Sequence, residues 1–192
     1  VDNTDDFAAI VTNCRNRIFS IALVHEQLYQ TDNLSRLRMD AYVSTLLTDL
    51  QFAHQGSVPV TVRTNTDSVV LGIGEAIPVG IIINELVTNA FKHAFTDLPS
   101  GTVNVSLVQT GEDAVALTVE DDGCGARAIA APVPGAVRKS LGLELVRVLT
   151  EQIDGTLAVD LDVVERTDLN GTACRCGTRF AITFPYRAVI DS

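Results

Sequence analysis

Residues 84–95 (NELVTNAFKHAF) place hydrogen-bonding side chains inside one of the most apolar stretches of the chain. In a helix, which turns by about 100° per residue, Glu85, Asn89, Lys92 and His93 fall on one stripe. A carboxylate, an amide, an ammonium and an imidazole can hold a metal ion or an anion. The opposite side is apolar and consists of Ile83, Leu86, Val87, Ala90 and Ala94. A solvated helix face would explain the stripe, but the stripe has no ordinary Glu–Lys i,i+4 pair, which favours a binding site.

Three further motifs combine glycine with polar groups where predicted strands end or helices begin. Asp121, Gly123 and Gly125 form a D-x-G-x-G pattern, in which a carboxylate can accept an amine hydrogen bond and glycine lets a ligand approach the backbone. Gly142 lies at the start of a predicted helix, whose free N–H groups bind phosphate. Thr178 offers a hydroxyl at the start of the last strand. Each motif is weak alone, but their joint order is specific.

Hydrophobic periodicity predicts the elements that position these residues. We expect helices over residues 5–30, 41–55, 75–95 and 141–153, with Asp40 as the N-cap of the second. Strands are expected over residues 58–64, 68–73, 101–110, 113–121, 155–162 and 178–185. Residues 163–177 are predicted to be a polar loop. Residues 122–140 lack periodicity, and a loop of this length indicates a lid.

The composition limits the classes of partner. The chain has 192 residues and a net charge of −10, with the acids scattered, so we expect no nucleic acid partner. A nucleotide that arrives with Mg²⁺ is compatible with this charge. No run approaches the roughly 18 apolar residues of a membrane span, so no membrane contact is expected of this fragment. Four cysteines and three histidines are too dispersed for a metal cluster and are typical of a cytosolic protein.

The four motifs together resemble the Bergerat-fold (GHKL) ATP-binding domain of histidine kinases, gyrase-type ATPases, Hsp90 and MutL. Residues 84–95 resemble its N box, DDGCG at 121–125 the G1 box, SLGLELV at 140–146 the G2 box and GTRF at 177–180 the last G box. Residues 20–47 resemble the end of the dimerisation segment of HisKA_2-class sensor histidine kinases. The resemblance covers about residues 15 to 185.

This resemblance implies an α+β two-layer sandwich, with a mixed sheet packed on helices and preceded by a helical segment. Residues 1–56 would be the C-terminal part of the dimerisation region, and residues 57–192 the catalytic ATP-binding domain. Asn89 resembles the amide that coordinates Mg²⁺ on ATP, and Glu85 the general base or polarising group. The phosphates and the lid edge would be contacted by Lys92, His93, Gly142 and Leu143.

The same resemblance assigns the adenine end of the site. Asp121 is similar to the carboxylate that binds the adenine amine, and Gly123 and Gly125 would shape its turn. Thr178 would support adenine through its hydroxyl or a water. The family commonly has Asn after this Asp, whereas Asp122 adds a negative charge near a polyanion unless it points away or caps a neighbour.

The implied activity is transfer of the ATP γ-phosphoryl group to a histidine, for relay to the receiver domain of a response regulator. The parent protein would be a cytoplasmic or membrane-bound homodimer. No HHRVKNN-like acceptor segment occurs in the sequence, so we expect the acceptor upstream of residue 1, with His25 as the rival. His54 is expected to be a surface residue at a helix end.

Two other functions stay open at this point. An anti-sigma-factor-type serine kinase shares the N box, but residues 20–29 disfavour it because that class needs no dimerisation helix there. A catalytically degenerate scaffold is disfavoured by the intact set of Glu85, Asn89, Lys92 and Asp121.

Overall fold

The computed structural model of the protein describes residues 36–54, 58–96, 98–123, 141–167 and 173–186. Of the N-terminal part it describes residues 11, 18, 21–24 and 26, all of them helical. The rest of the helix predicted over residues 5–30 lies outside the described residues. So do His25 and Gly125, together with residues 124–140 of the predicted lid.

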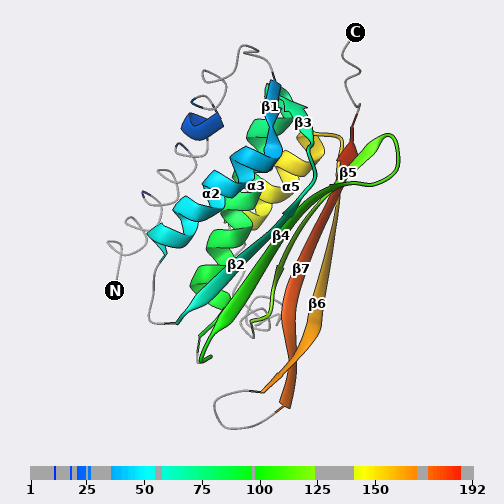
Figure 1. Ribbon diagram of the computed structural model, residues 1–192. Helices are drawn as coiled ribbons and strands as arrows, with labels where there is room; N and C mark the ends of the chain where they lie inside the picture. The colour runs from blue at the N-terminus through cyan, green and yellow to red at the C-terminus, as the bar shows by residue number, and fades with distance from the viewer. Residues whose placement is uncertain are drawn as a thin grey trace.

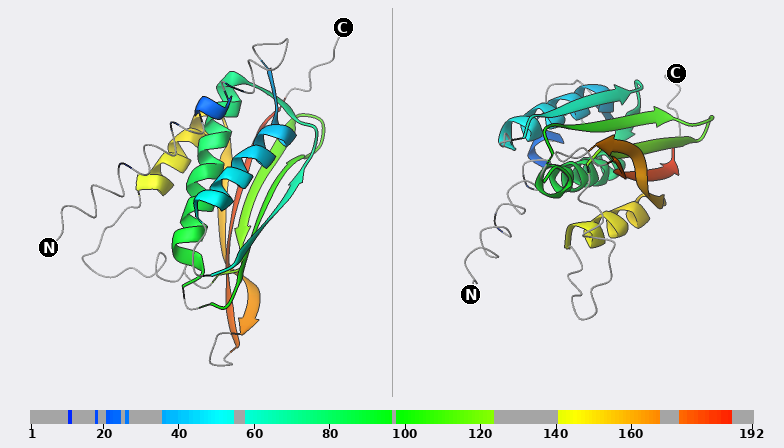
Figure 2. Two further views of the ribbon diagram at one scale, coloured as in Figure 1. Left: turned by 60° about the vertical axis from the view of Figure 1, so that its left-hand side comes forward. Right: turned by 90° about the horizontal axis from the view of Figure 1, so that it is seen from below.

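A five-stranded mixed sheet forms one layer, and helices cover one of its faces (Figures 1 and 2). The strand order is β2 (Val60–Thr66), β4 (Gly101–Gln109), β5 (Ala114–Asp121), β7 (Ala173–Pro185) and β6 (Thr156–Thr167). Only β2 and β4 pair in parallel; the other neighbours are antiparallel. This arrangement confirms the predicted two-layer α+β sandwich.

The helical layer consists of α2 (Met39–Ala53), α3 (Ile73–Asn89) and α5 (Leu141–Gln152). A π-helical segment, η1 (Ala90–Ala94), continues α3. A two-stranded antiparallel sheet of β1 (Arg36–Arg38) and β3 (Val70–Gly72) lies near the beginning of α3 (Figure 1). In this layer α3 contacts both α2 and α5. The middle helix is therefore α3, which carries Glu85 and Asn89 and is called the site helix below.

The core lies between the two layers because β5, and β4 up to Val108, alternate between buried and half-buried residues. Their buried side chains pack on the apolar residues of α3, and α2 contributes Tyr42, Leu46 and Leu50 to the same core. Tyr42 lies against Gly80 of α3, where a Cβ atom would be only 1.9 Å from the phenolic oxygen. The helix α2 thus lies before the predicted boundary at residue 56 but packs in the same core as the sheet.

Two local predictions were wrong. Asp40 lies in the first turn of α2 and is not its N-cap, a position that Arg38 occupies; the two side chains form an ion pair, with Nη2 and Oδ2 2.6 Å apart. Residues 163–177 are not a loop throughout, since β6 runs to Thr167 and β7 begins at Ala173. The ladder shifts register between Leu161 and Val164, and this irregularity breaks the alternation by which the strand would have been recognised.

The open face of the sheet is polar. One row of paired residues crosses all five strands and carries charges of both signs on four of them: Arg63, the neutral Asn104, Glu120, Arg179 and Asp160. Within the row, Nε of Arg179 donates to Oε2 of Glu120 at 2.7 Å.

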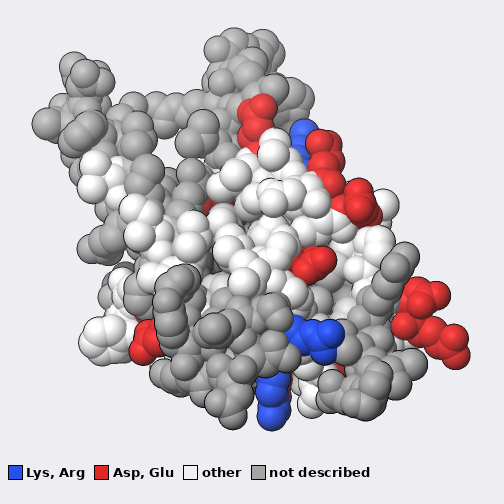
Figure 3. Space-filling view, turned by 90° about the horizontal axis from the view of Figure 1, so that it is seen from above, with Lys and Arg blue, Asp and Glu red and all other residues white. Residues whose placement is uncertain are grey.

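Viewed from above, Asp and Glu side chains form several separate groups rather than one patch (Figure 3).

Candidate active site

The site helix is buried on almost its whole circumference, because α2 and α5 flank it and the sheet lies beneath it. Glu85 is only 7% exposed and Asn84 only 2%. Thr88, also buried, donates to Oδ1 of Asn84 at 3.3 Å. Burial argues against a solvated face at Glu85, whereas Asn89 is half-buried and Lys92 and His93, at the end of the stripe, are exposed. Glu85 is thus a buried carboxylate within an otherwise apolar part of α3, which keeps it a candidate functional group.

The last turn of this helix is π-helical, from Ala90 to Ala94. The apolar periodicity predicts a regular α-helix to Phe95, but a π-helix forms i→i+5 hydrogen bonds and changes the direction of the side chains that follow. Lys92 and His93 are exposed, and Ala90 and Ala94 face the core. Partial desolvation and the adjacent Lys92 charge lower the pKa of His93. Lys92 and His93 therefore place an ammonium and an imidazole on the exposed side of η1, at the C-terminal end of the site helix.

Asp121 is the last residue of β5 and lies in one row with Val103 and Thr178. Its side chain is buried, and Oδ1 accepts a hydrogen bond from the Gly123 N–H at 3.0 Å. The pKa of Asp121 is raised to about 6, chiefly by burial and to a smaller extent by the charge of Asp122, against the lowering effect of hydrogen bonds from Gly123 and Thr178. Three predicted adenine-side residues, Asp121, Gly123 and Thr178, are thus joined by hydrogen bonds.

Gly123 brings this turn against the end of the site helix. A Cβ atom on Gly123 would lie 2.2 Å from the carbonyl oxygen of Ala94, closer than any side chain tolerates. The backbone of the turn that follows β5 therefore packs directly against the backbone of η1. This packing brings the turn that carries Asp121 next to the segment that carries Lys92 and His93.

Gly177 closes the other side of the turn and was missing from the predicted site residues. Its N–H donates to the Gly123 carbonyl at 2.6 Å. Its φ is +87°, and a Cβ atom there would meet the Asp121 carbonyl oxygen at 2.7 Å. Both observations require glycine. The signal in the sequence is the glycine directly before Thr178, the first residue of the GTRF motif.

Asp122 caps a neighbouring strand. Its Oδ1 accepts the Thr102 N–H at 2.7 Å, and its own N–H donates to the Thr102 carbonyl at 3.2 Å. This answers the question that the sequence left open, because the Asp122 carboxylate is held on the backbone of β4. Its charge still acts on Asp121 through space.

The other predicted residues have definite places. Asn89 is half-buried and lies one turn after Glu85 on α3. Gly142 and Leu143 lie in the first turn of α5, are half-buried, and Leu143 packs against the core. The described residues contain no cluster of three His, Cys, Asp or Glu side chains suited to a metal ion. A single amide oxygen suits Mg²⁺, which commonly takes few protein ligands and completes its shell with water and substrate phosphates.

Comparison with known proteins identifies two matching families. Residues 74–188 match the model described as histidine kinase-, DNA gyrase B- and HSP90-like ATPase, and residues 2–54 match the HisKA_2 histidine kinase model. Blue-light-activated histidine kinase 2 of Erythrobacter litoralis is 34% identical over 105 residues, 54% of this chain and 29% of that protein. Sensor histidine kinase PdtaS of Mycolicibacterium smegmatis is 30% identical over 161 residues, 82% of this chain.

The fold is shared with solved histidine kinases. The histidine kinase domain of the E. litoralis EL346 blue-light activated kinase superposes with a TM-score of 0.68 at 22% identity, covering 90% of this chain and 74% of that one. Mycobacterial sensor histidine kinase MprB gives a TM-score of 0.58 at 20% identity, covering 80% and 99%. The chain spans 29% and 31% of the length of the two curated relatives named above. It belongs to the histidine kinase-, DNA gyrase B- and HSP90-like ATPases and carries the ATP-binding domain of a sensor histidine kinase.

Proposed function

We propose that this chain binds ATP·Mg²⁺ and transfers the γ-phosphoryl group to a histidine. The observation that carries the proposal is the hydrogen-bonded group of Asp121, Gly123 and Thr178, packed against the end of the site helix within a matched ATPase family. In this proposal the Asp121 carboxylate accepts the adenine amine. The Asn89 amide holds Mg²⁺, which when bound neutralises phosphate charge.

Transfer would be mainly a matter of position and charge. A nitrogen of the acceptor imidazole attacks the γ-phosphorus while the bond to the β-phosphate oxygen breaks, and ADP leaves with the electron pair. Glu85 takes the proton of the attacking imidazole. Lys92 contacts the phosphates, His93 the nucleotide edge, and Gly142 and Leu143 the phosphate end of the lid.

We further propose that the acceptor is none of the three histidines of this chain. The phosphoryl group would then pass to the receiver domain of a response regulator, and the whole protein would act as a cytoplasmic homodimer. The match of residues 2–54 to the HisKA_2 model supports a histidine kinase over an anti-sigma-factor-type serine kinase. Within the described residues, no helix is both long and apolar enough to cross a membrane.

Calorimetry with ADP and Mg²⁺ tests the binding. Asp121→Ala should weaken binding by about 1–3 kcal/mol, because the adenine amine loses a buried partner. Asn89→Ala should weaken binding with Mg²⁺ far more than without it. Equal binding by the wild type and Asp121→Ala would refute the assignment of Asp121.

Kinetics test the chemistry. With a HisKA_2-type dimerisation domain supplied as substrate, Glu85→Gln should bind ATP normally but transfer phosphate more slowly, by about 100-fold or more. A wild-type rate in Glu85→Gln would reject Glu85 as the base. If the wild-type chain itself transferred no phosphate, that result would support the alternative of a catalytically degenerate scaffold.

A further inference from the structure

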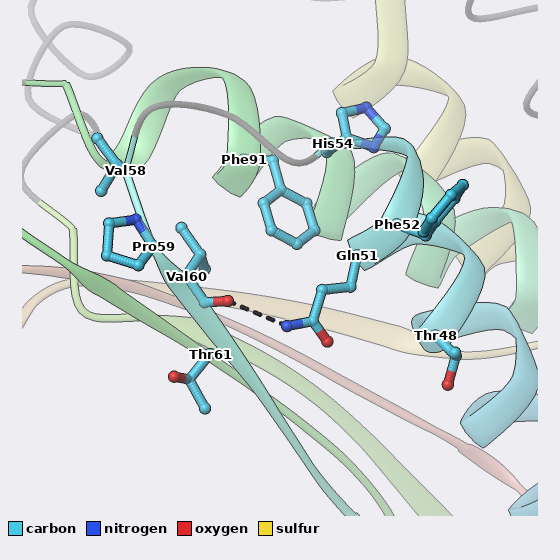
Figure 4. Close-up of a pocket in the computed structure, with 9 residues that line it drawn as sticks. All are labelled: Thr48, Gln51, Phe52, His54, Val58, Pro59, Val60, Thr61 and Phe91. Atoms are coloured by element: carbon cyan, nitrogen blue, oxygen red, sulfur yellow. Dashed lines mark hydrogen bonds between the residues drawn. The ribbon is translucent and has the colours of Figure 1, made fainter.

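A hollow of about 530 Å³ lies beside η1, between the end of α2 and the beginning of β2 (Figure 4). The ring of Phe91 projects from η1 into this hollow, with His54 on one side and Pro59 and Val60 on the other. The rings of His54 and Phe91 are stacked, with centroids 5.4 Å apart and planes inclined by 9°. None of the proposed nucleotide contacts lines this hollow.

His54 is held firmly to the end of α2. It is the C-cap of that helix, and its backbone N–H donates to the Leu50 carbonyl at 3.1 Å. Its Nδ1 lies 3.0 Å from the same carbonyl oxygen. Leu50 is buried in the core, so the imidazole is bound to the backbone of a helix whose apolar side is packed in the core. His54 thus lies at a helix end, as expected, and is half-buried rather than fully exposed.

Phe91 is the second residue of the π-helical segment, and Lys92 follows it directly. Isolated π-turns are rare in proteins and occur where surrounding contacts hold them, often at functional sites. Besides its contacts with the core, η1 touches other elements at both of its ends. Ala94 meets the backbone of Gly123 at its end, and Phe91 meets His54 near its beginning.

We infer that His54 is a positioning residue of the nucleotide site, whose stack on Phe91 holds η1 in the π-turn that directs Lys92 and His93 outward. The inference rests on the proposed function, since the ligand concerned is ATP·Mg²⁺. His54 is also the last residue of the segment that matches the HisKA_2 model, whereas Phe91 belongs to the ATPase match. A movement of α2 would thus be transmitted by the stacked rings of His54 and Phe91 to Lys92, at the phosphate end of the proposed site.

Two substitutions separate the stack from the hydrogen bond. His54→Phe keeps a flat ring on Phe91 without a ring nitrogen, and His54→Asn keeps a hydrogen-bonding group at the helix end without the ring. ATP·Mg²⁺ affinity should fall about two- to ten-fold in His54→Asn, the range expected for an aromatic pair, and stay near wild type in His54→Phe. AMP affinity should change less, because Lys92 acts on the phosphate chain. Phe52→Ala, two residues away and 76% exposed, is the matched control and should bind normally.

Hydrogen exchange of residues 90–94 provides a readout that does not depend on a ligand. Exchange there should be faster in His54→Asn than in His54→Phe or the wild type. If both His54 variants bind ATP·Mg²⁺ and exchange like the wild type, or if His54→Phe is as impaired as His54→Asn, the inference is overturned and the proposed function is untouched. If the wild type binds no nucleotide, the proposed function fails, and the exchange data alone decide whether the stack holds η1.

Discussion

Asp121 combines two opposing properties in one side chain. Its burial favours the protonated acid, and its pKa of about 6 lies well above the value of 3.8 for an ordinary aspartate. Its proposed role requires the ionised form, because a charge-assisted hydrogen bond to the adenine amine is stronger than a neutral one. The free site is therefore charged at neutral pH but loses its charge in mild acid.

The first prediction concerns the pH dependence of binding. Because adenine binding favours the ionised carboxylate, ADP affinity should fall as the pH drops through about 6, by up to about ten-fold per unit below it. Asp121→Asn should bind more weakly at pH 8 and show little dependence between pH 7 and 5. Asp113→Asn, an exposed residue at the β4–β5 turn, is the control and should follow the wild type. A flat profile for the wild type would contradict the prediction.

The second prediction concerns stability. A carboxyl group that binds its proton more tightly in the folded state makes the fold less stable as the pH rises from about 4 to about 6. Asp121→Asn removes this loss. At pH 7 the difference in unfolding free energy between this variant and the wild type should favour the variant by about 2–3 kcal/mol more than it does near pH 3. Urea denaturation at the two pH values measures it, and an unchanged difference would count against a raised pKa.

At the scale of elements, the π-turn and the turn after β5 are in direct backbone contact through Ala94 and Gly123. The third prediction is that Gly123→Ala lowers the unfolding free energy by about 1–3 kcal/mol, the usual cost of overpacking, and weakens ADP binding as well. Gly74→Ala offers a control of identical chemistry, since a Cβ atom in that first turn of α3 meets nothing within 4 Å. Thermal unfolding and calorimetry on both variants provide the comparison. Equal effects would show that the contact with Ala94 is unimportant.

The elements differ in how well the sequence predicted them. The alternation of β4 and β5 and the apolar residues of α3 gave elements of the right type, because their core-facing side chains repeat with a regular period. The π-turn was not predictable in this way, since it depends on Gly123 and His54, which are distant in the chain. Gly177 was overlooked because its requirement arises from the carbonyl of Asp121 on the neighbouring strand. The end of β6 was missed because a register shift hides the alternation.

For the whole molecule, the fourth prediction concerns self-phosphorylation. If the acceptor is none of its own histidines, the purified chain should bind ATP yet acquire no histidine-linked phosphate. His25 is the rival acceptor and lies outside the described residues. Radiolabelled ATP with the wild type and His25→Gln distinguishes the two: acid-labile, base-stable label on the wild type alone would make His25 the acceptor and overturn the proposal.

The parallel pairing of β2 with β4 bears on the order in which the protein folds. Parallel neighbours cannot be joined by a tight turn, and here the connection from Thr66 to Gly101 contains β3, α3 and η1. The helix that carries Glu85 and Asn89 is thus part of the crossover that joins the edge strand β2 to β4. Contacts this distant in the chain form slowly, and the pairing of β5 with β7, which places Thr178 beside Asp121, joins residues still further apart, so a refolding chain should gain its binding site only after both pairings have formed. Stopped-flow refolding with a fluorescent nucleotide present would show strand pairing and nucleotide binding together, or refute the link by showing binding first.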